Sequence, residues 1–153
     1  MLLDRLPHQE DSKSQIGTII DMSAKSKTVR RHLNLPGRKT PLPFSDAVQV
    51  GDTLYLSGRI GIDPVTGVVP TDVDDELRLL FDGFEAVLRE ADMSMDDLVW
   101  VQVYSPDVSL WECFNGAYLK RFSKELPARA FIGSGPLLKG GRFEMLGVAV
   151  RRS

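Results

Sequence analysis

The sequence is poor in the side chains that carry most metal and nucleophilic chemistry. Its 153 residues include one cysteine, Cys113, and two histidines, His8 and His32, both in the N-terminal segment. One cysteine forms no internal disulfide, and a cysteine nucleophile usually needs a histidine partner. A Ser-His-Asp relay and a His/Cys zinc site lack their residues in the same way. We therefore expect Cys113 to be a thiol buried on a helix, and we expect no metal, although a magnesium site built only from carboxylates stays open.

Long apolar runs and a strong net charge are also absent. No run approaches the ~20 residues of a membrane helix, and the N-terminus has no apolar segment of signal-peptide length. The formal net charge is −2, which excludes a general attraction to nucleic acid or anionic membranes. The hydrophobic share of 42% and the charged share of 26% are typical of one ordinary domain. We expect a cytoplasmic protein that binds neither membrane nor nucleic acid.

The first forty residues differ in character from the rest. Residues 1–40 are polar, and the stretch 25–40 holds six Lys and Arg residues with no acidic residue. This stretch has two interpretations, a nucleic-acid arm or a solvated or partner-bound tail, and the second is favoured. Val29, Leu33 and Leu35 could add a short strand to the edge of the domain. We expect residues 1–40 to be an extension and residues 41–153 to be the folded domain.

The periodicity of the folded domain predicts an α+β protein. Two short strands over 46–50 and 53–57 form a hairpin around Gly51-Asp52, and the second strand ends at Gly58. Helical spacing predicts a helix over 73–91, with acidic residues in its first turn. Ser109 and Glu112 have the form of a capping box that opens a second helix, which ends at Leu126-Pro127. Further strands are expected over 98–104, 128–132 and 143–150, which gives the order β-β-α-β-α-β.

The final strand is apolar on both faces. Phe143, Met145 and Ala149 point one way, whereas Leu146 and Val148 point the other way, and the strand over 98–104 has a similar character. A strand that is apolar on both faces is covered on both. Two helices cover one face of a sheet, so a second subunit is the economical cover for the other face. The pattern alone therefore predicts a homo-oligomer.

Two charged residues interrupt these apolar strands. Glu144 shares a face with Leu146 and Val148, and Arg129 lies on the preceding strand. Because a charge in an apolar setting is costly unless paired, one interpretation is a structural ion pair, or strand-end charges that reach water. The other is a guanidinium that binds a substrate carboxylate beside a carboxylate that handles a proton or water. The pattern alone favours the structural interpretation. The nearby Gly-rich segment 133–141 lacks the spacing of a phosphate loop, which favours a loop that lines a site.

Several blocks of the sequence, taken together, resemble the RidA (YjgF, reactive intermediate deaminase) family, also labelled endoribonuclease L-PSP. The resemblance covers about residues 41–151, and its blocks agree in order and spacing: 43–48 (PFSDAV), 56–58 (LSG) with Ile60, 63–67 (DPVTG), Asn115 with Tyr118, 126–130 (LPARA), 138–140 (LKG) and 143–144 (FE). It implies a chorismate-mutase-like fold and a homotrimer. The sheets would line a central barrel, the helices would lie outside, and the sites would lie between subunits.

The resemblance also implies a reaction, the hydrolysis of reactive enamines and imines to 2-oxo acids and ammonia, as in 2-iminobutanoate/2-iminopropanoate deaminases. Arg129 would bind the substrate carboxylate, and Glu144 would position and activate the attacking water. Ser57 and Gly58 would line the pocket, and Asn115 would lie near the subunit boundary. No cofactor is required, because an imine carbon is already electrophilic.

The sequence departs from the family's pattern at three positions of the implied site. Phe44 stands where the deaminases often carry tyrosine, Phe131 stands where they often carry cysteine, and Arg59 replaces a common glutamine. These changes remove a hydroxyl group, narrow the pocket and add a positive charge. A different imino or acyl substrate, a non-catalytic trimer that binds small carboxylates or partner proteins, and a ribonuclease remain as alternatives.

Overall fold

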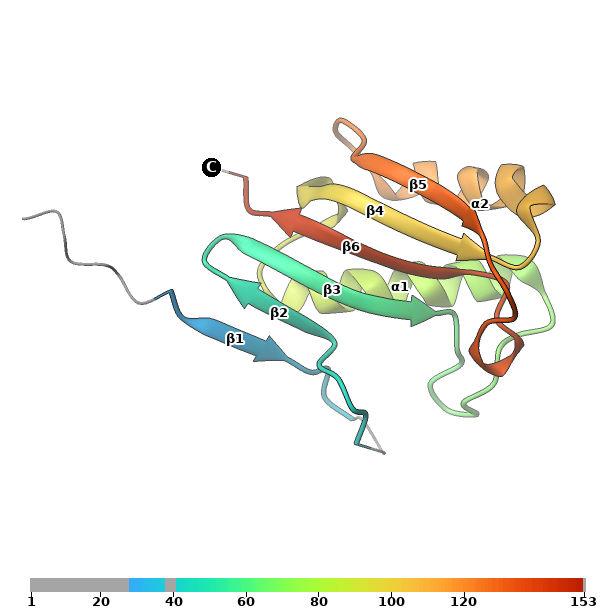
Figure 1. Ribbon diagram of the computed structural model, residues 1–153, viewed down its shortest axis with the longest axis horizontal. Helices are drawn as coiled ribbons and strands as arrows, with labels where there is room; N and C mark the ends of the chain where they lie inside the picture. The colour runs from blue at the N-terminus through green and yellow to red at the C-terminus, as the bar shows by residue number, and fades with distance from the viewer. Residues whose placement is uncertain (1–27, 38–40, 153) are drawn as a thin grey trace, which may run out of the picture.

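The computed structural model describes residues 28–37 and 41–152, which form one six-stranded sheet with two helices packed on one face (Figure 1). The sheet order is β1-β2-β3-β6-β4-β5, and every neighbouring pair is antiparallel except β4 and β5. The strands are β1 Arg30–Leu33, β2 Ala47–Val50, β3 Thr53–Ile60, β4 Leu98–Ser105, β5 Ala128–Gly133 and β6 Glu144–Val150. The helices are α1 Val73–Glu90 and α2 Trp111–Tyr118. The expected α+β class and element order are confirmed.

Helix α1 forms where the spacing predicts it. Asp72 caps its N-terminus by accepting hydrogen bonds from the backbone N–H groups of Asp74 and Asp75, so two otherwise unpaired donors are satisfied. One face of the helix is buried against the sheet, and each large side chain on it contributes about 1.5–3 kcal/mol through removal of apolar surface from water. The buried apolar residues of this face are Leu77, Leu80, Phe81, Phe84, Val87 and Leu88.

The strands alternate between the helix-covered face and an open face. Leu54, Val101 and Met145 point toward the helices and are fully buried. Tyr55 and Trp100 oppose Val148 from the two neighbouring strands, on the face without helices. Tyr55 is 52% exposed and Trp100 is 36% exposed. The predicted two-sided character of β6 is confirmed, and two helices do cover only one face.

The second helix is shorter than predicted, and its start is capped differently. Ser109 donates both its backbone N–H and its hydroxyl group to the Asp107 carboxylate, at 2.9 and 2.6 Å, so it does not form the expected capping box. A 3₁₀ turn precedes α2, and another follows it over Leu119–Arg121. Beyond that turn the chain becomes extended, because the backbone N–H groups of Ser123 and Lys124 donate to the Asp96 carboxylate instead of continuing the helix.

The predicted end of the hairpin at Gly58 is wrong. Strand β3 continues to Ile60 through a register shift against β6 between Leu56 and Arg59. The bulge is the physical reason for the error, because an extra residue breaks the two-residue alternation on which the prediction rests. It also turns Gly58 toward Glu144, as described below.

The N-terminal part of the chain is described only from Thr28 onward, with a further gap at 38–40. Within it, β1 lies at the sheet edge and pairs antiparallel with β2. The division at residue 40 stays a prediction, and four of the six basic residues of the stretch 25–40 lie outside the described residues. Cys113 lies half-buried on α2, and burial raises the pKa of its thiol, as expected for a structural cysteine. In the described part of the chain, neither helix is long and apolar enough to cross a membrane.

Candidate functional site

Arg129 is held on the helix-covered face of the edge strand β5. It opposes Val101, which is fully buried, so its side chain lies beneath α2. The guanidinium carbon lies 4.5 Å from the centre of the Tyr118 ring and 4.9 Å from that of Trp111. Its Nη2 donates to Asn115 Oδ1 at 2.7 Å. Arg129 and Asn115, both predicted at the site, are therefore in direct contact. The aromatic rings around the guanidinium form a cage that favours a cation.

No carboxylate within the described residues forms an ion pair with Arg129. Its Nη1 and the Tyr118 hydroxyl oxygen are both buried, and neither has a hydrogen-bond partner in that part of the chain. Burial raises the pKa of Tyr118 to about 12, against the opposing influence of the Arg129 charge. Tyr118 therefore stays neutral and does not neutralise the arginine. The cage holds a positive charge that has no compensating anion among the described residues.

Phe131 lies two residues after Arg129 on the same face of β5. Its ring meets the Trp111 ring edge-on at 5.3 Å and the Phe114 ring at 5.5 Å between centroids. The Phe131 ring occupies space beside the Arg129 guanidinium, which is the position from which it was expected to narrow the pocket. Trp111 packs against Phe131, and it also contacts Arg129 and is 42% exposed.

Glu144 is the first residue of β6 and lies on the open face of the sheet. Its neighbours across the strands are Ile60 and Tyr104. Gly58 lies against its carboxylate, since a Cβ atom built on Gly58 would come within 2.2 Å of Glu144 Oε1. Within residues 28–37 and 41–152, the Glu144 carboxylate forms no ion pair and accepts no hydrogen bond. A carboxylate in this state has its lone pairs available for water.

A cleft of about 430 Å³ adjoins this carboxylate through Gly58 and Ile60. Phe44 and Arg59, both expected at the site, line it, whereas Ser57 does not. The Arg59 guanidinium pairs with the Asp46 carboxylate at 3.0 Å, so its added charge is compensated. The Ser57 hydroxyl donates to the Ser45 carbonyl at 2.7 Å. The remaining lining of the cleft is mainly apolar: Leu35, Leu42, Ile62, Pro64 and Leu79.

The predicted site residues therefore fall into two groups on opposite faces of one sheet. Arg129 opposes Val101 and Glu144 opposes Tyr104, three residues along β4 and on different sides of it. At ~3.4 Å per residue and ~4.8 Å per strand, their Cα atoms lie about 14 Å apart. The structural ion pair favoured by the pattern is wrong, because the sheet separates the two charges. For the same reason, Arg129 and Glu144 of one chain do not lie side by side in a single site.

Sequence reasoning missed two features that this structure brings to the site. Trp111, Asn115 and Tyr118 lie at helical spacing on one face of α2, which was a readable signal for a cage around Arg129. Glu76 was predicted only as one of the acidic residues in the first turn of a helix, yet it is fully buried and paired with Arg142. In the described part of the chain, no group of three or more His, Cys, Asp or Glu side chains is arranged to hold a metal ion.

Comparisons with known proteins agree with this fold. The model of the family described as endoribonuclease L-PSP matches residues 38–151. A 2-iminobutanoate/2-iminopropanoate deaminase of Bos taurus is 34% identical over 110 residues, which cover 71% of this chain and 80% of that protein. The solved RidA structure from an Antarctic Psychrobacter superposes with a TM-score of 0.69 at 28% identity, covering 78% of this chain and 94% of the other.

A second solved structure, E. coli TdcF with bound serine, matches with a TM-score of 0.70 at 26% identity and covers 80% of this chain and 94% of that one. The family match spans most of the chain, and the solved neighbours share its mixed sheet with two helices on one face. The chain belongs to the RidA (YjgF, endoribonuclease L-PSP) family.

Proposed function

We propose that this protein hydrolyses reactive 2-imino acids and their enamine tautomers to 2-oxo acids and ammonia, in sites formed between the subunits of a homotrimer. The observation that carries the proposal is the state of Arg129. Its guanidinium is positioned by Asn115 and by rings, and no carboxylate of the described chain neutralises it. A carboxylate ligand suits such a group, because a desolvated charge gains most from a paired, hydrogen-bonded anion.

The open sheet face supports the trimer. It presents a contiguous set of partly exposed apolar residues, including Tyr55, Trp100, Leu146 and Val148, on the side opposite the helices. Exposed apolar surface of this kind marks a contact surface. The proposed site requires a second copy to place its own Arg129 near the first copy's Glu144, because one chain alone keeps these two residues on opposite faces of the sheet. Each site would then take its carboxylate-binding group and its water-activating group from different subunits.

The chemistry would proceed by addition of water to the imine carbon. Arg129 would hold the substrate carboxylate through charge-assisted hydrogen bonds, which places the adjacent C=N carbon. Glu144 would accept a proton as water attacks that carbon and would deliver it to the nitrogen. The resulting carbinolamine would then collapse: the hydroxyl proton passes to the nitrogen, the C–N bond breaks, the C=O bond forms and ammonia departs. Imine and water together give one 2-oxo acid and one ammonia, so no redox partner or cofactor enters the balance.

The names of relatives give further support. Several curated relatives at 32–34% identity are named 2-iminobutanoate/2-iminopropanoate deaminase. The TdcF structure holds serine, a small molecule with the carboxylate that Arg129 is proposed to bind. The substrate class proposed here is the one those names describe.

The test is ammonia release from 2-iminopropionate generated in situ by an amino-acid oxidase. Arg129→Ala removes a charged hydrogen-bond donor worth about 1.5–3 kcal/mol, so kcat/KM should fall about 10- to 150-fold. Glu144→Gln should lower kcat by about 10²–10⁴-fold, the usual contribution of a general base. Arg78→Ala is the matched control, since Arg78 is an exposed arginine of α1 with surface ion pairs only. Unchanged turnover in Arg129→Ala would contradict the assigned role.

Phe131 favours a second candidate, a trimer that binds small carboxylates without turnover. Its ring stands against Trp111 beside the guanidinium and could leave room for a carboxylate but not for attack by water. This candidate predicts saturable binding of pyruvate or serine by calorimetry, lost in Arg129→Ala, with no ammonia from any imine tested. Activity in the wild type would reject it.

A further inference from the structure

A buried carboxylate at the start of α1 holds the chain immediately before Glu144. Glu76 is fully buried, although acidic side chains are rarely buried unless they are paired. Its Oε1 accepts hydrogen bonds from the backbone N–H groups of Arg142 and Phe143, at 2.7 and 3.3 Å. Its Oε2 pairs with Nε of the Arg142 guanidinium. One side chain therefore satisfies three donors of the two residues that precede Glu144.

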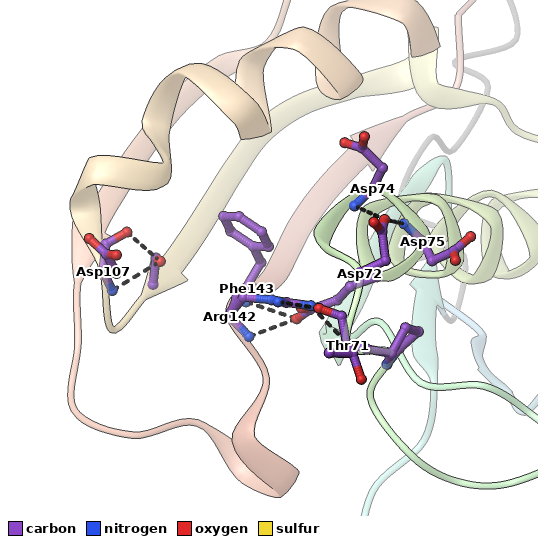
Figure 2. A network of polar contacts seen from close by, with 10 residues as sticks. Thr71, Asp72, Asp74, Asp75, Asp107, Arg142 and Phe143 are labelled. Carbon is purple, nitrogen blue, oxygen red and sulfur yellow. Dashed lines mark hydrogen bonds and ion pairs between the residues drawn. The ribbon is translucent and has the colours of Figure 1, made fainter.

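Arg142 completes the connection from the other side. Its Nη1 donates to the Thr71 carbonyl at 2.8 Å and its Nη2 to the Pro70 carbonyl at 2.7 Å (Figure 2). Figure 2 shows Arg142 and Phe143 lying against this turn and the first residues of α1. Five hydrogen bonds thus join the segment before β6 to α1 and to the residues before it. Three of them go to Glu76, and two go to the Thr71 and Pro70 carbonyls. We call this group, Glu76 with Arg142, the clamp.

The clamp lies where the sheet no longer restrains the chain. Glu144 is the first residue of β6, and its strand partners are Ile60 and Tyr104. Before Glu144 the ladder ends, so the clamp supplies the restraint on that side. Phe143, held through its N–H, is fully buried and packs on Phe114 at 5.3 Å between ring centroids. The backbone entering Glu144 is therefore fixed by polar contacts on α1 and by packing in the core.

We propose that Glu76 and Arg142 are positioning residues for the reaction, which set the place and direction of the Glu144 carboxylate. This inference rests on the proposed function of Glu144 as the group that activates water. A proton acceptor works only at hydrogen-bond reach of its water, and a displacement of about 1 Å can lower a rate by ~100-fold. Because Arg129 lies on β5 and is held by α2, loss of the clamp should change the water-activating step and leave carboxylate binding largely as it is.

The experiment compares Glu76→Gln with Glu85→Gln, the same change on the same helix. Among the described residues, Glu85 forms its ion pairs with Arg121, at 3.3 Å, and with Arg89, at 4.0 Å. Glu76→Gln keeps an oxygen for the two backbone donors but turns an amide toward Arg142. We expect kcat to fall about 10- to 100-fold with KM within twofold, and Glu85→Gln to behave as the wild type. Equal kcat in the two variants would overturn the inference, and so would a large change in KM without a change in kcat.

A second measurement does not depend on turnover. Glu76→Ala removes the acceptor altogether, so amide hydrogen exchange at Arg142, Phe143 and Glu144 should accelerate at least tenfold relative to the amide of Gly147 in the middle of β6. Unchanged exchange at Glu144 would overturn the clamp even if the wild type proved inactive on imines. An inactive wild type with accelerated exchange would reject the proposed reaction and keep the clamp. Should Glu76→Ala fail to fold, the same exchange pattern is measured on Arg142→Lys, which loses the fork that binds the Pro70 and Thr71 carbonyls.

Discussion

Replacing Gly58 by alanine tests the role of Glu144 without touching either charged residue. A Cβ atom at Gly58 would lie 2.2 Å from Glu144 Oε1, 3.1 Å from its Cδ and 3.4 Å from its Cγ. Ordinary contact of a Cβ atom begins at 3.4 Å, so the carboxylate must move by about 1 Å or adopt another rotamer. The obstructing atom is the end of a flexible side chain, and the backbone has no need to shift.

The stability and the activity should therefore separate. A rotamer change in Glu144 costs about 0.5–1.5 kcal/mol, while removal of a glycine from a strand returns about 0.5–1 kcal/mol through the unfolded chain. The free energy of unfolding should change by less than about 1 kcal/mol. The rate should fall far more, by about 100-fold in kcat, because a general base displaced by about 1 Å loses its alignment with water.

The assay is ammonia release from 2-iminopropionate, with urea unfolding followed by circular dichroism on the same preparations. Gly116→Ala is the matched control, since no atom lies within 4 Å of a Cβ built at that position of α2. That variant should be fully active and up to about 1 kcal/mol more stable, as expected for alanine in a helix. The reasoning fails if Gly58→Ala keeps kcat within threefold of the wild type, or if it is destabilised by more than about 2 kcal/mol.

Three further predictions follow from the fold. Gly61→Ala should lower stability by more than about 2 kcal/mol in urea unfolding, because its Cβ would lie 2.0 Å from a backbone oxygen, that of Glu76, and not from a side-chain end; equal stability to Gly58→Ala would refute this. Burial raises the folded-state pKa of Tyr118 to about 12 from its ordinary value near 10. The unfolded chain therefore loses this proton first as pH rises, and up to about 3 kcal/mol of stability disappears between pH 10 and 12. In urea unfolding, the free energy of unfolding of Tyr118→Phe should fall less between pH 10 and 12 than that of the wild type. An identical fall in the two proteins would contradict the raised pKa of Tyr118. Val148→Glu should convert the proposed trimer to a 17 kDa monomer in sedimentation velocity, whereas Val65→Glu, at an 81% exposed loop position, should leave the assembly unchanged; a trimer that survives Val148→Glu would place the interface elsewhere.

The predicted elements that held are those with a strong local signal. Helix α1 has seven apolar positions at helical spacing and an acidic start, and its observed bounds differ from the predicted ones by one residue. The errors occurred where a distant partner decided the outcome. The Asp107 carboxylate accepts a hydrogen bond from the Ser109 backbone N–H. The Asp96 carboxylate accepts hydrogen bonds from the backbone N–H groups of Ser123 and Lys124, which therefore do not continue the second helix. Neither partner can be recognised from the local pattern of the segment it changes.

The candidate site shows the same division. The strand pattern identified Arg129 and Glu144 as charges in apolar surroundings, and the family resemblance assigned them a use. Chain order placed them on successive strands, which suggested a pair. In the sheet, β4 lies between those strands, and the two side chains leave opposite faces.

Local spacing and residue type were enough to predict the fold class, the alternation of the strands and the two charged residues, Arg129 and Glu144, that interrupt them. Only the tertiary structure decided that β4 separates Arg129 from Glu144, that α2 surrounds the guanidinium with rings, and that Glu76 is a buried clamp on Arg142 and not a solvated acid. The physical reason is that sheet order, side-chain pairing and burial arise from contacts between segments far apart in the chain, such as the 66 positions between Glu76 and Arg142. A periodic pattern carries no information about which distant segment will meet it.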